Sequence, residues 1–326
     1  MRVRRNGCEL LLESATTINQ VSIGKMALSA KLVLVKLLKN YVLLKVSATA
    51  DAKGDKTAQR LVDTAAAALK FLSSHCVAVP LTSKVQGKSY FSFALQNKRG
   101  KVKLSRPVNK DLFIPDPSNL NLEPLARGKL IELPHEVRSQ FLYTVAMSYC
   151  CAADILKTGD QKTPATFFEC LIGHLLARAF GTNPRTQVEV LRLEEEASTL
   201  PTDFIFDLGQ SKPKFHVPVK ISTRERVIQV FAHQRVLDGV HGFGRFTGIL
   251  VCLTETKLDH EKREVIEICV PKQWGLYQRF IAPMYRFYYF DIPKRYAELA
   301  GGDPPMAVMD FAKFFEEVRS LAASGK

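Results

Sequence analysis

The sequence predicts an α/β protein in which helices flank a mixed central β-sheet and a smaller α+β subdomain lies at the N-terminus. Two observations support this fold class. Segments in which apolar residues occupy every second position, as in strands, alternate with segments in which they recur every three or four positions, as in helices. A proline-containing stretch at 109–125 is the best candidate linker, so we expect an accessory subdomain at 1–125 and a core at 126–326.

The accessory part is predicted to contain two helices and two strands. The helices are expected at 27–48 and 57–73, and the second carries its apolar residues on one face. The strands are expected at 77–80 and 88–96. A basic turn at 98–103 follows, and it is typical of a solvated hairpin tip more than of a phosphate contact.

The core part is predicted to begin with two helices. The first spans 134–157, and the second runs from Thr163, taken as its N-cap, to a stop at Gly181. The later elements are a first core strand at 188–193, strands at 248–254 and 264–270, a helix followed by a strand within 274–289, and a last helix at about 306–322.

A β-hairpin is expected in the middle of the chain, because apolar and polar residues alternate on both sides of a turn centred on Ser211. If the hairpin is symmetric about that residue, Asp203 lies within one residue of Lys220 across the strand pair. The other carboxylate of the same strand, Asp207, then lies near Phe215 and far from the lysine. The pattern therefore selects one acid–lysine pair at the open end of the hairpin.

A carboxylate beside a lysine at a strand end is suited to phosphodiester hydrolysis. The carboxylate of Asp203 offers hard oxygen ligands for Mg2+. The ammonium group of Lys220 can orient or help to deprotonate an attacking water and can balance the charge of a phosphate. The alternative is an ordinary cross-strand ion pair at the margin of a sheet, which is common and contributes little.

The segment after Lys220 is predicted to open a basic helix, with Thr223 or Ser222 as its cap. Its first turn would carry Arg-Glu-Arg. An arginine can bind guanine through O6 and N7, and a glutamate can accept a hydrogen bond from cytosine N4, so this turn is suited to reading G·C pairs in a major groove. The alternative is a solvated helix start with local ion pairs.

Lys220 followed four to six residues later by Arg224, Glu225 and Arg226 resembles the K-x-x-x-R-(D/E)-R arrangement of a group of type II restriction endonucleases. This group recognises CCGG, or that sequence interrupted by one base pair, and belongs to the PD-(D/E)xK nuclease superfamily. The resemblance is densest over 163–238, and the N-terminal third shows none. It implies a restriction-endonuclease-like core, and it implies that Arg224, Glu225 and Arg226 read G·C pairs.

The resemblance also implies an acidic cluster, in which Glu169 of the preceding helix joins Asp203. On the residues alone, Glu169 is also consistent with a partly exposed surface glutamate. The common form of this site has a second acid two residues before the lysine, where this chain has Pro218. In the CCGG group an acid of the following helix replaces it, at a place held here by His233 and Gln234. The expected catalytic residues are thus Asp203, Lys220, Glu169 and Gln234, with Asp203 and Glu169 as metal ligands.

The composition points to a folded protein with a polyanionic partner. A net charge of +14 favours nucleic acid over a membrane surface. Seven cysteines without metal-binding spacing predict reduced, buried thiols in a cytoplasmic protein. The apolar run at 32–46 is too short and too charged to span a bilayer.

These observations lead to one expected function and three alternatives. The expected function is Mg2+-dependent cleavage of double-stranded DNA at a short palindromic G·C-rich site, leaving 5′-phosphates. The palindrome requires a homodimer or tetramer, and a cognate DNA methyltransferase is implied as genetic partner. The alternatives are a repair nuclease of the same superfamily, a non-catalytic DNA-binding protein on a decayed nuclease fold, and a basic RNA-binding protein.

Overall fold

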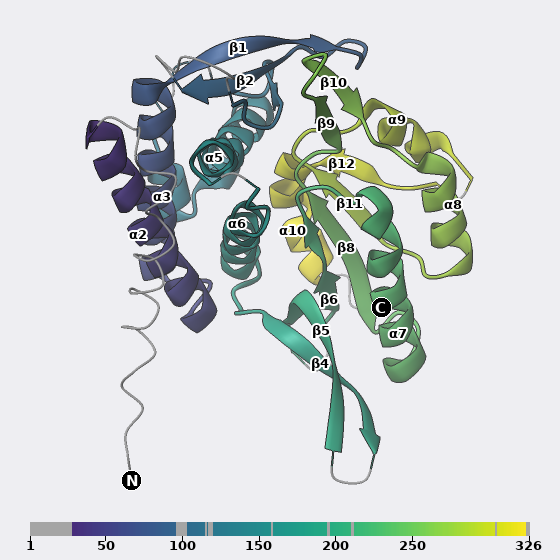
Figure 1. The fold of residues 1–326 in the computed structure, drawn as a ribbon. Helices are drawn as coiled ribbons and strands as arrows, with labels where there is room; N and C mark the ends of the chain where they lie inside the picture. Colours follow the sequence, from purple (N-terminus) through teal and green to yellow (C-terminus); the bar gives the residue numbers. More distant parts are fainter. Residues whose placement is uncertain are drawn as a thin grey trace, which may run out of the picture.

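The structure is a computed structural model that describes residues 28–95, 103–114, 116, 120–157, 159–193, 196–209, 212–303 and 305–323. It is an α/β fold with helices around a mixed central sheet, which confirms the predicted fold class (Figure 1). The central sheet has the strand order β12-β11-β8-β6-β5-β4, and β7 pairs with β8 beside this path. A second sheet has the order β3-β2-β1-β10-β9.

The two helices and two strands predicted in the N-terminal part lie close to their expected positions, and a short further strand was not predicted. These elements are α2 (Leu28–Ala50), α3 (Asp55–His75), β1 (Cys76–Ser83), β2 (Tyr90–Leu95) and β3 (Val108–Asn109). The predicted basic turn at 98–103 lies outside the described residues except for Lys103.

The rest of the chain supplies the central sheet and the helices around it. Its helices are α4 (Glu123–Arg127), α5 (His135–Leu156), α6 (Lys162–Phe180), α7 (Val227–His241), α8 (Pro271–Phe280), α9 (Lys294–Ala297) and α10 (Phe314–Ala323). Its strands are β4 (Arg185–Leu193), β5 (Glu196–Asp207), β6 (Lys214–Val217), β7 (Val219–Lys220), β8 (Phe246–Cys252), β9 (Thr256–Asp259), β10 (Glu264–Glu267), β11 (Arg286–Tyr289) and β12 (Val308–Asp310).

The strand predicted at 188–193 is confirmed as β4, which begins at Arg185 and lies at the edge of the sheet. Two other local predictions were wrong. The last helix begins at Phe314, because the residues before it include β12, which pairs in parallel with β11. Thr163 does not cap α6: Asp160 accepts hydrogen bonds from its backbone N (3.0 Å) and its Oγ1 (2.5 Å), so the acid one turn earlier holds this helix start.

Helices cover both faces of the central sheet. Phe206 and Phe215 pack in the core that contains α6, whereas Ile205 packs with Leu237 of α7. Because successive strand residues point to opposite faces, α6 and α7 lie on opposite sides of β5 and β6. Strand β6 is therefore buried on both faces, and His216, which the alternating pattern placed on the polar side, has 0% exposure.

Helix α6 packs tightly against the sheet at Gly173. A Cβ atom at this position would lie 2.7 Å from Cζ of Phe204, the residue that follows Asp203. We expect Gly173→Ala to lower the free energy of unfolding by about 1–3 kcal/mol, because a methyl group here forces α6 away from β5. Urea denaturation measures this loss. Gly275→Ala is the matched control, since a Cβ at that helical glycine meets nothing within 4 Å.

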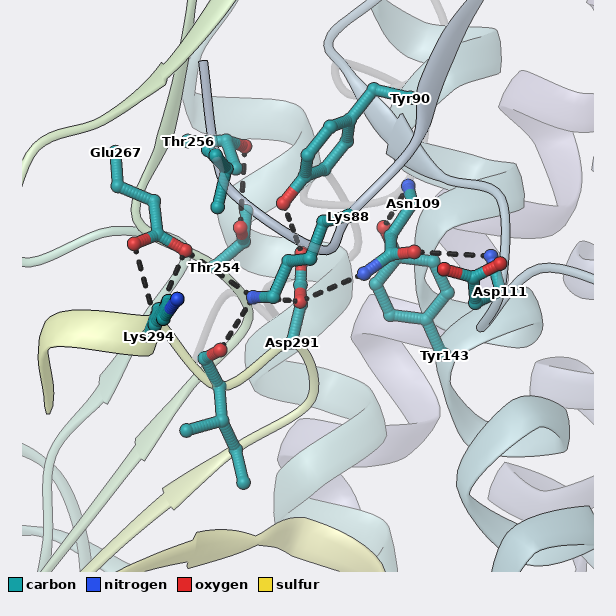
Figure 2. Close-up of polar contacts among 12 residues, drawn as sticks. Lys88, Tyr90, Asn109, Asp111, Tyr143, Thr254, Thr256, Glu267, Asp291 and Lys294 are labelled. Carbon is teal, nitrogen blue, oxygen red and sulfur yellow. Dashed lines mark hydrogen bonds and ion pairs between the residues drawn. The ribbon is translucent and has the colours of Figure 1, made fainter. Parts of the chain in front are cut away.

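A buried polar network joins the N-terminal elements to the central sheet (Figure 2). Asp291, which follows β11, is 2% exposed. Its carboxylate accepts hydrogen bonds from Lys88 Nζ (2.8 Å), Asn109 Nδ2 (3.0 Å) and Tyr90 Oη (3.3 Å). Lys88 also lies 3.2 Å from Glu267 Oε1. Together with the parallel pairing of β1 and β10, this network ties the two parts of the chain together. The domain boundary at residue 125 stays a prediction.

Two expectations from composition can be compared with the structure. Six of the seven cysteines lie in the described part of the chain, and all six are buried, as predicted; Cys8 lies outside it. Within the described ranges, no helix has the length and apolar character that crossing a membrane requires.

Candidate active site

The hairpin that carries the predicted site has a register one residue away from the expected one. Phe204 pairs with Val217 and Asp207 pairs with Lys214, so the centre of the turn is displaced from Ser211. Asp207 therefore faces Lys214, with which it forms an ion pair (2.8 Å), and not Phe215. The shift leaves Asp203 at the open end of the hairpin, as the pattern indicated.

Pro218 interrupts the strand pairing at the open end of the hairpin. It has no N–H group to donate, and the pairing with β5 ends before it: β6 pairs with both β5 and β8, whereas β7 pairs with β8. Asp203 Oδ2 accepts the hydrogen bond of Val219 N (2.7 Å) and also that of Lys220 Nζ (2.7 Å). The predicted contact between Asp203 and Lys220 is confirmed. Their side chains are 21% and 24% exposed, so solvent reaches the pair.

Glu169 of α6 interacts electrostatically with both Asp203 and Lys220. Burial, and to a smaller extent the charge of Asp203, raise the pKa of its carboxyl to about 7, against the lowering effect of Lys220. Among the described residues, no hydrogen-bond donor contacts this carboxylate. Two carboxylates that repel one another, one of them without a hydrogen-bond donor, match the hard oxygen ligands that a divalent cation prefers.

The two candidates on α7 behave differently. Gln234 is buried, and both ends of its amide are used: Oε1 accepts from His216 Nδ1 (3.0 Å), and Nε2 donates to Asp238 (3.0 Å) and to the carbonyl of Phe246 (2.9 Å). His233 is half-buried, and the charges of Lys220 and Asp203 both act on its pKa, which burial lowers. Of α7, His233 thus interacts electrostatically with the Asp203–Lys220 pair.

The candidate site therefore contains few carboxylates. Within the described residues, no three His, Cys, Asp or Glu side chains are arranged to hold a metal ion. Asp203 and Glu169 are the two carboxylates whose charges interact beside Lys220. Water would have to complete the coordination of any ion held between them, which is usual for Mg2+ in proteins.

A surface pocket at the turn end of the hairpin is separate from this site. It has a volume of about 650 Å³, and Asp207, Lys214, Arg185 and Arg245 are among its lining residues. Neither Asp203 nor Lys220 lines it.

The Arg-Glu-Arg segment was predicted to form the first turn of an α-helix, and this was wrong. It forms a short 3-10 helix, η4 (Arg224–Arg226), which leads into α7. Thr223 does not cap this helix through its side chain, because its Oγ1 donates to Glu255 (2.5 Å). Arg224 and Arg226 are exposed, whereas the side chain of Glu225 lies outside the described part of the structure. The exposed arginines follow within six residues of Lys220 in sequence.

Sequence reasoning missed two buried residues of this region. Glu255 is fully buried and accepts hydrogen bonds from the segment between Lys220 and η4. His216 is fully buried, burial lowers its pKa to about 4, and its Nε2 atom has no hydrogen-bond partner among the described residues. A glutamate two residues after the apolar run 249–253 was a visible signal for Glu255, but its donors in Ser222, Thr223 and Tyr289 are more than thirty positions away.

Comparison with solved structures connects this geometry to a class of protein. The chain is similar to the type IIP restriction endonuclease Kpn2I, with a TM-score of 0.73 and 25% sequence identity over 89% of this chain and 99% of that one. The fold is that of a type II restriction endonuclease. This similarity supports a nuclease of that class, and it spans the N-terminal elements as well as the central sheet.

Other comparisons add little. The restriction endonuclease PspGI, solved with substrate DNA, aligns with a TM-score of 0.36 and 15% identity over 61% of this chain and 78% of that one, which is too weak a similarity to carry an argument. No protein-family model and no curated protein sequence matched the chain.

Proposed function

We propose that this protein is a type II restriction endonuclease that makes Mg2+-dependent double-strand cuts at a short palindromic G·C-rich DNA site of the CCGG type. The observation that carries the proposal is the contact of Lys220 with Asp203 at a partly exposed strand end, together with the half-buried Glu169, in a fold similar to that of Kpn2I. The exposed Arg224 and Arg226 and the net charge of +14 support binding to DNA.

Each residue of the site has a chemical role in this proposal. Asp203 and Glu169 hold Mg2+, which when bound supplies positive charge at the scissile phosphate and favours ionisation of water. Lys220 orients the attacking water and offsets the charge that develops on the phosphate. An oxygen–phosphorus bond forms to the water while the bond from phosphorus to the 3′ oxygen breaks, which leaves a 5′-phosphate and a 3′-hydroxyl.

Recognition is assigned to the segment that follows Lys220. Arg224 and Arg226 would donate to O6 and N7 of guanine, and Glu225 would accept from N4 of cytosine. A palindromic site presents the same bases to two copies of the chain, so the active form would be a homodimer or a tetramer. A cognate DNA methyltransferase would protect the host sites.

The pH dependence of stability tests the role of Glu169. Its pKa is raised from 4.5 to about 7 in the folded protein, so the folded state favours the protonated form and loses stability as pH rises through about 7. We therefore compare the free energies of unfolding of the metal-free variant Glu169→Gln and the metal-free parent. The variant minus the parent should be about 2 kcal/mol larger at pH 8 than at pH 5.5. Mg2+ should raise the melting temperature of the parent at pH 8 but not that of the variant. An equal Mg2+ effect on both proteins would remove Glu169 from the metal site.

The function itself is tested by incubating the protein with unmethylated phage DNA and Mg2+, beside a Lys220→Ala control. The expected result is a set of discrete fragments that the control does not produce, with 5′-phosphorylated ends that map to one G·C-rich palindrome. Cleavage at many unrelated sequences would indicate the repair nuclease. Arg224→Ala separates these two, because it should abolish cutting at one defined sequence but change a structure-selective nuclease little.

A second candidate function is sequence-specific DNA binding without cleavage. The observation that favours it is the small acidic set: Pro218 replaces one acid, and Gln234 is turned away into a buried network. This candidate predicts that neither Mg2+ nor Mn2+ supports cleavage, and that Lys220→Ala leaves DNA binding unchanged.

A further inference from the structure

Glu255 lies in the connection between β8 and β9, and its side chain is fully buried. Both carboxylate oxygens accept hydrogen bonds from the segment that follows Lys220. Ser222 Oγ donates at 2.7 Å, and Thr223 donates through its backbone N (2.9 and 3.1 Å) and through Oγ1 (2.5 Å). One buried acid thus holds consecutive residues of this segment.

All donors to Glu255 among the described residues are neutral groups, since the others are the backbone N of Arg224 (3.4 Å), Tyr289 Oη (3.1 Å) and the thiol of Cys252 (3.6 Å). A buried carboxylate without a cation is unfavourable unless hydrogen bonds satisfy its oxygens. Moving the Ser222–Thr223 segment would remove most of these bonds and leave the acid unsatisfied. The buried acid therefore resists any displacement of this segment.

The next residue, Arg224, has a backbone conformation that needs such support. Its φ angle is +42°, in the left-handed region that residues other than glycine rarely adopt. A strained backbone of this kind persists only where the surroundings determine it. Hydrogen bonds from the backbone N of Thr223 and of Arg224 to Glu255 hold this conformation where η4 begins.

The strand before Glu255 also holds the backbone of Lys220. Leu253 N donates to the carbonyl of Lys220 (3.0 Å), and Thr254 N donates to the carbonyl of Ile221 (3.0 Å). Glu255 accepts hydrogen bonds from the next two residues, Ser222 and Thr223. Residues 253–255 therefore fix the position of Lys220 and the start of η4 as one unit.

We propose that Glu255 is a positioning residue that sets base discrimination. It would do so by holding the recognition segment, residues 222–226, in a fixed position relative to Lys220. This inference rests on the proposed function and deepens it. Glu255 contacts neither the Asp203–Lys220 pair nor solvent, so it acts through the placement of Arg224 and Arg226.

The test is Glu255→Gln, which keeps the shape of the side chain but replaces one carboxylate oxygen by an NH2 group. Backbone N–H groups can only donate, so they cannot form a hydrogen bond to that NH2 group. We expect the ratio of cleavage rates at the cognate site and at sites altered in one base pair to fall about tenfold or more, the size of one lost base contact. KM for the cognate site should rise about tenfold, whereas kcat should change less than about threefold, because Asp203 and Lys220 are untouched.

Tyr289→Phe is the matched control. It removes one hydrogen bond to the same carboxylate, but the bond comes from β11 and not from the recognition segment. Discrimination should remain as in the parent. Ser222→Ala is a second variant for the case in which Glu255→Gln does not fold, and it should lower the discrimination ratio in the same direction by a smaller factor.

Hydrogen exchange of the free protein gives a readout that does not need cleavage. Glu255→Gln should raise exchange in the peptide covering 221–228 and leave the peptide covering 167–176 of α6 unchanged. Unchanged discrimination together with unchanged exchange at 221–228 would overturn the inference. If the parent cuts no DNA, the proposed function fails and the role in discrimination fails with it, whereas the exchange result still decides whether Glu255 holds the segment.

Discussion

Asp203→Asn is expected to lower the rate of DNA cleavage by about three orders of magnitude or more, while the protein still folds and binds DNA. The substitution removes a charged oxygen from the proposed metal site and the ion-pair partner of Lys220 at 2.7 Å. The amide can still accept the hydrogen bond of Val219 N, so the strand end should keep its shape. Single-turnover cleavage with Mg2+, and a gel-shift assay with Ca2+, measure the two effects separately.

Asp207→Asn is the matched control, because Asp207 lies on the same strand and has its own lysine partner, Lys214, at 2.8 Å. It should cleave within a few-fold of the parent. The double variant of Asp203→Asn and Lys220→Ala should be about as slow as either single variant, since residues that act as a unit are not additive. Losses that add in the double variant, or equal losses in the Asp207 control, would mean that this pair is not the centre of the chemistry.

Asp291→Ala is expected to lower the free energy of unfolding by about 3–5 kcal/mol, the usual effect of removing one partner of a buried ion pair. Asp291 is 2% exposed, and its loss leaves Lys88 with Glu267 as its remaining acid. Asn109 and Tyr90 lose their shared acceptor at the same time (Figure 2). Urea denaturation followed by circular dichroism measures the change.

Glu132→Ala provides the comparison for Asp291. Glu132 pairs with Lys129 at the surface, where both side chains are more than half exposed, at 61% and 52%. Its removal should change stability by less than about 1 kcal/mol, because water screens the pair. A loss of the same small size for Asp291→Ala would show that water replaces the buried network, and that β1 and β10 alone join the two parts of the chain.

Much of the architecture follows from local sequence pattern. The periodicity of apolar residues placed α3, α5, α6 and the β5–β6 hairpin within a few residues of their bounds. The same alternation selected Asp203 over Asp207 as the partner of Lys220. These inferences succeeded because they depend on side chains close together in sequence, whose faces a strand or a helix determines by itself.

The sequence by itself determined the fold class, the acid–lysine pair and the basic segment after it. Only the tertiary structure decided three further points: the one-residue register of the hairpin, the burial of the hydrogen-bonded His216 and Gln234, and the hydrogen bonds of Ser222 and Thr223 to Glu255. The reason is physical. Each of these depends on which groups approach from elements up to about thirty residues away, and burial on both faces of β6 overrides the alternation that a half-exposed strand would show.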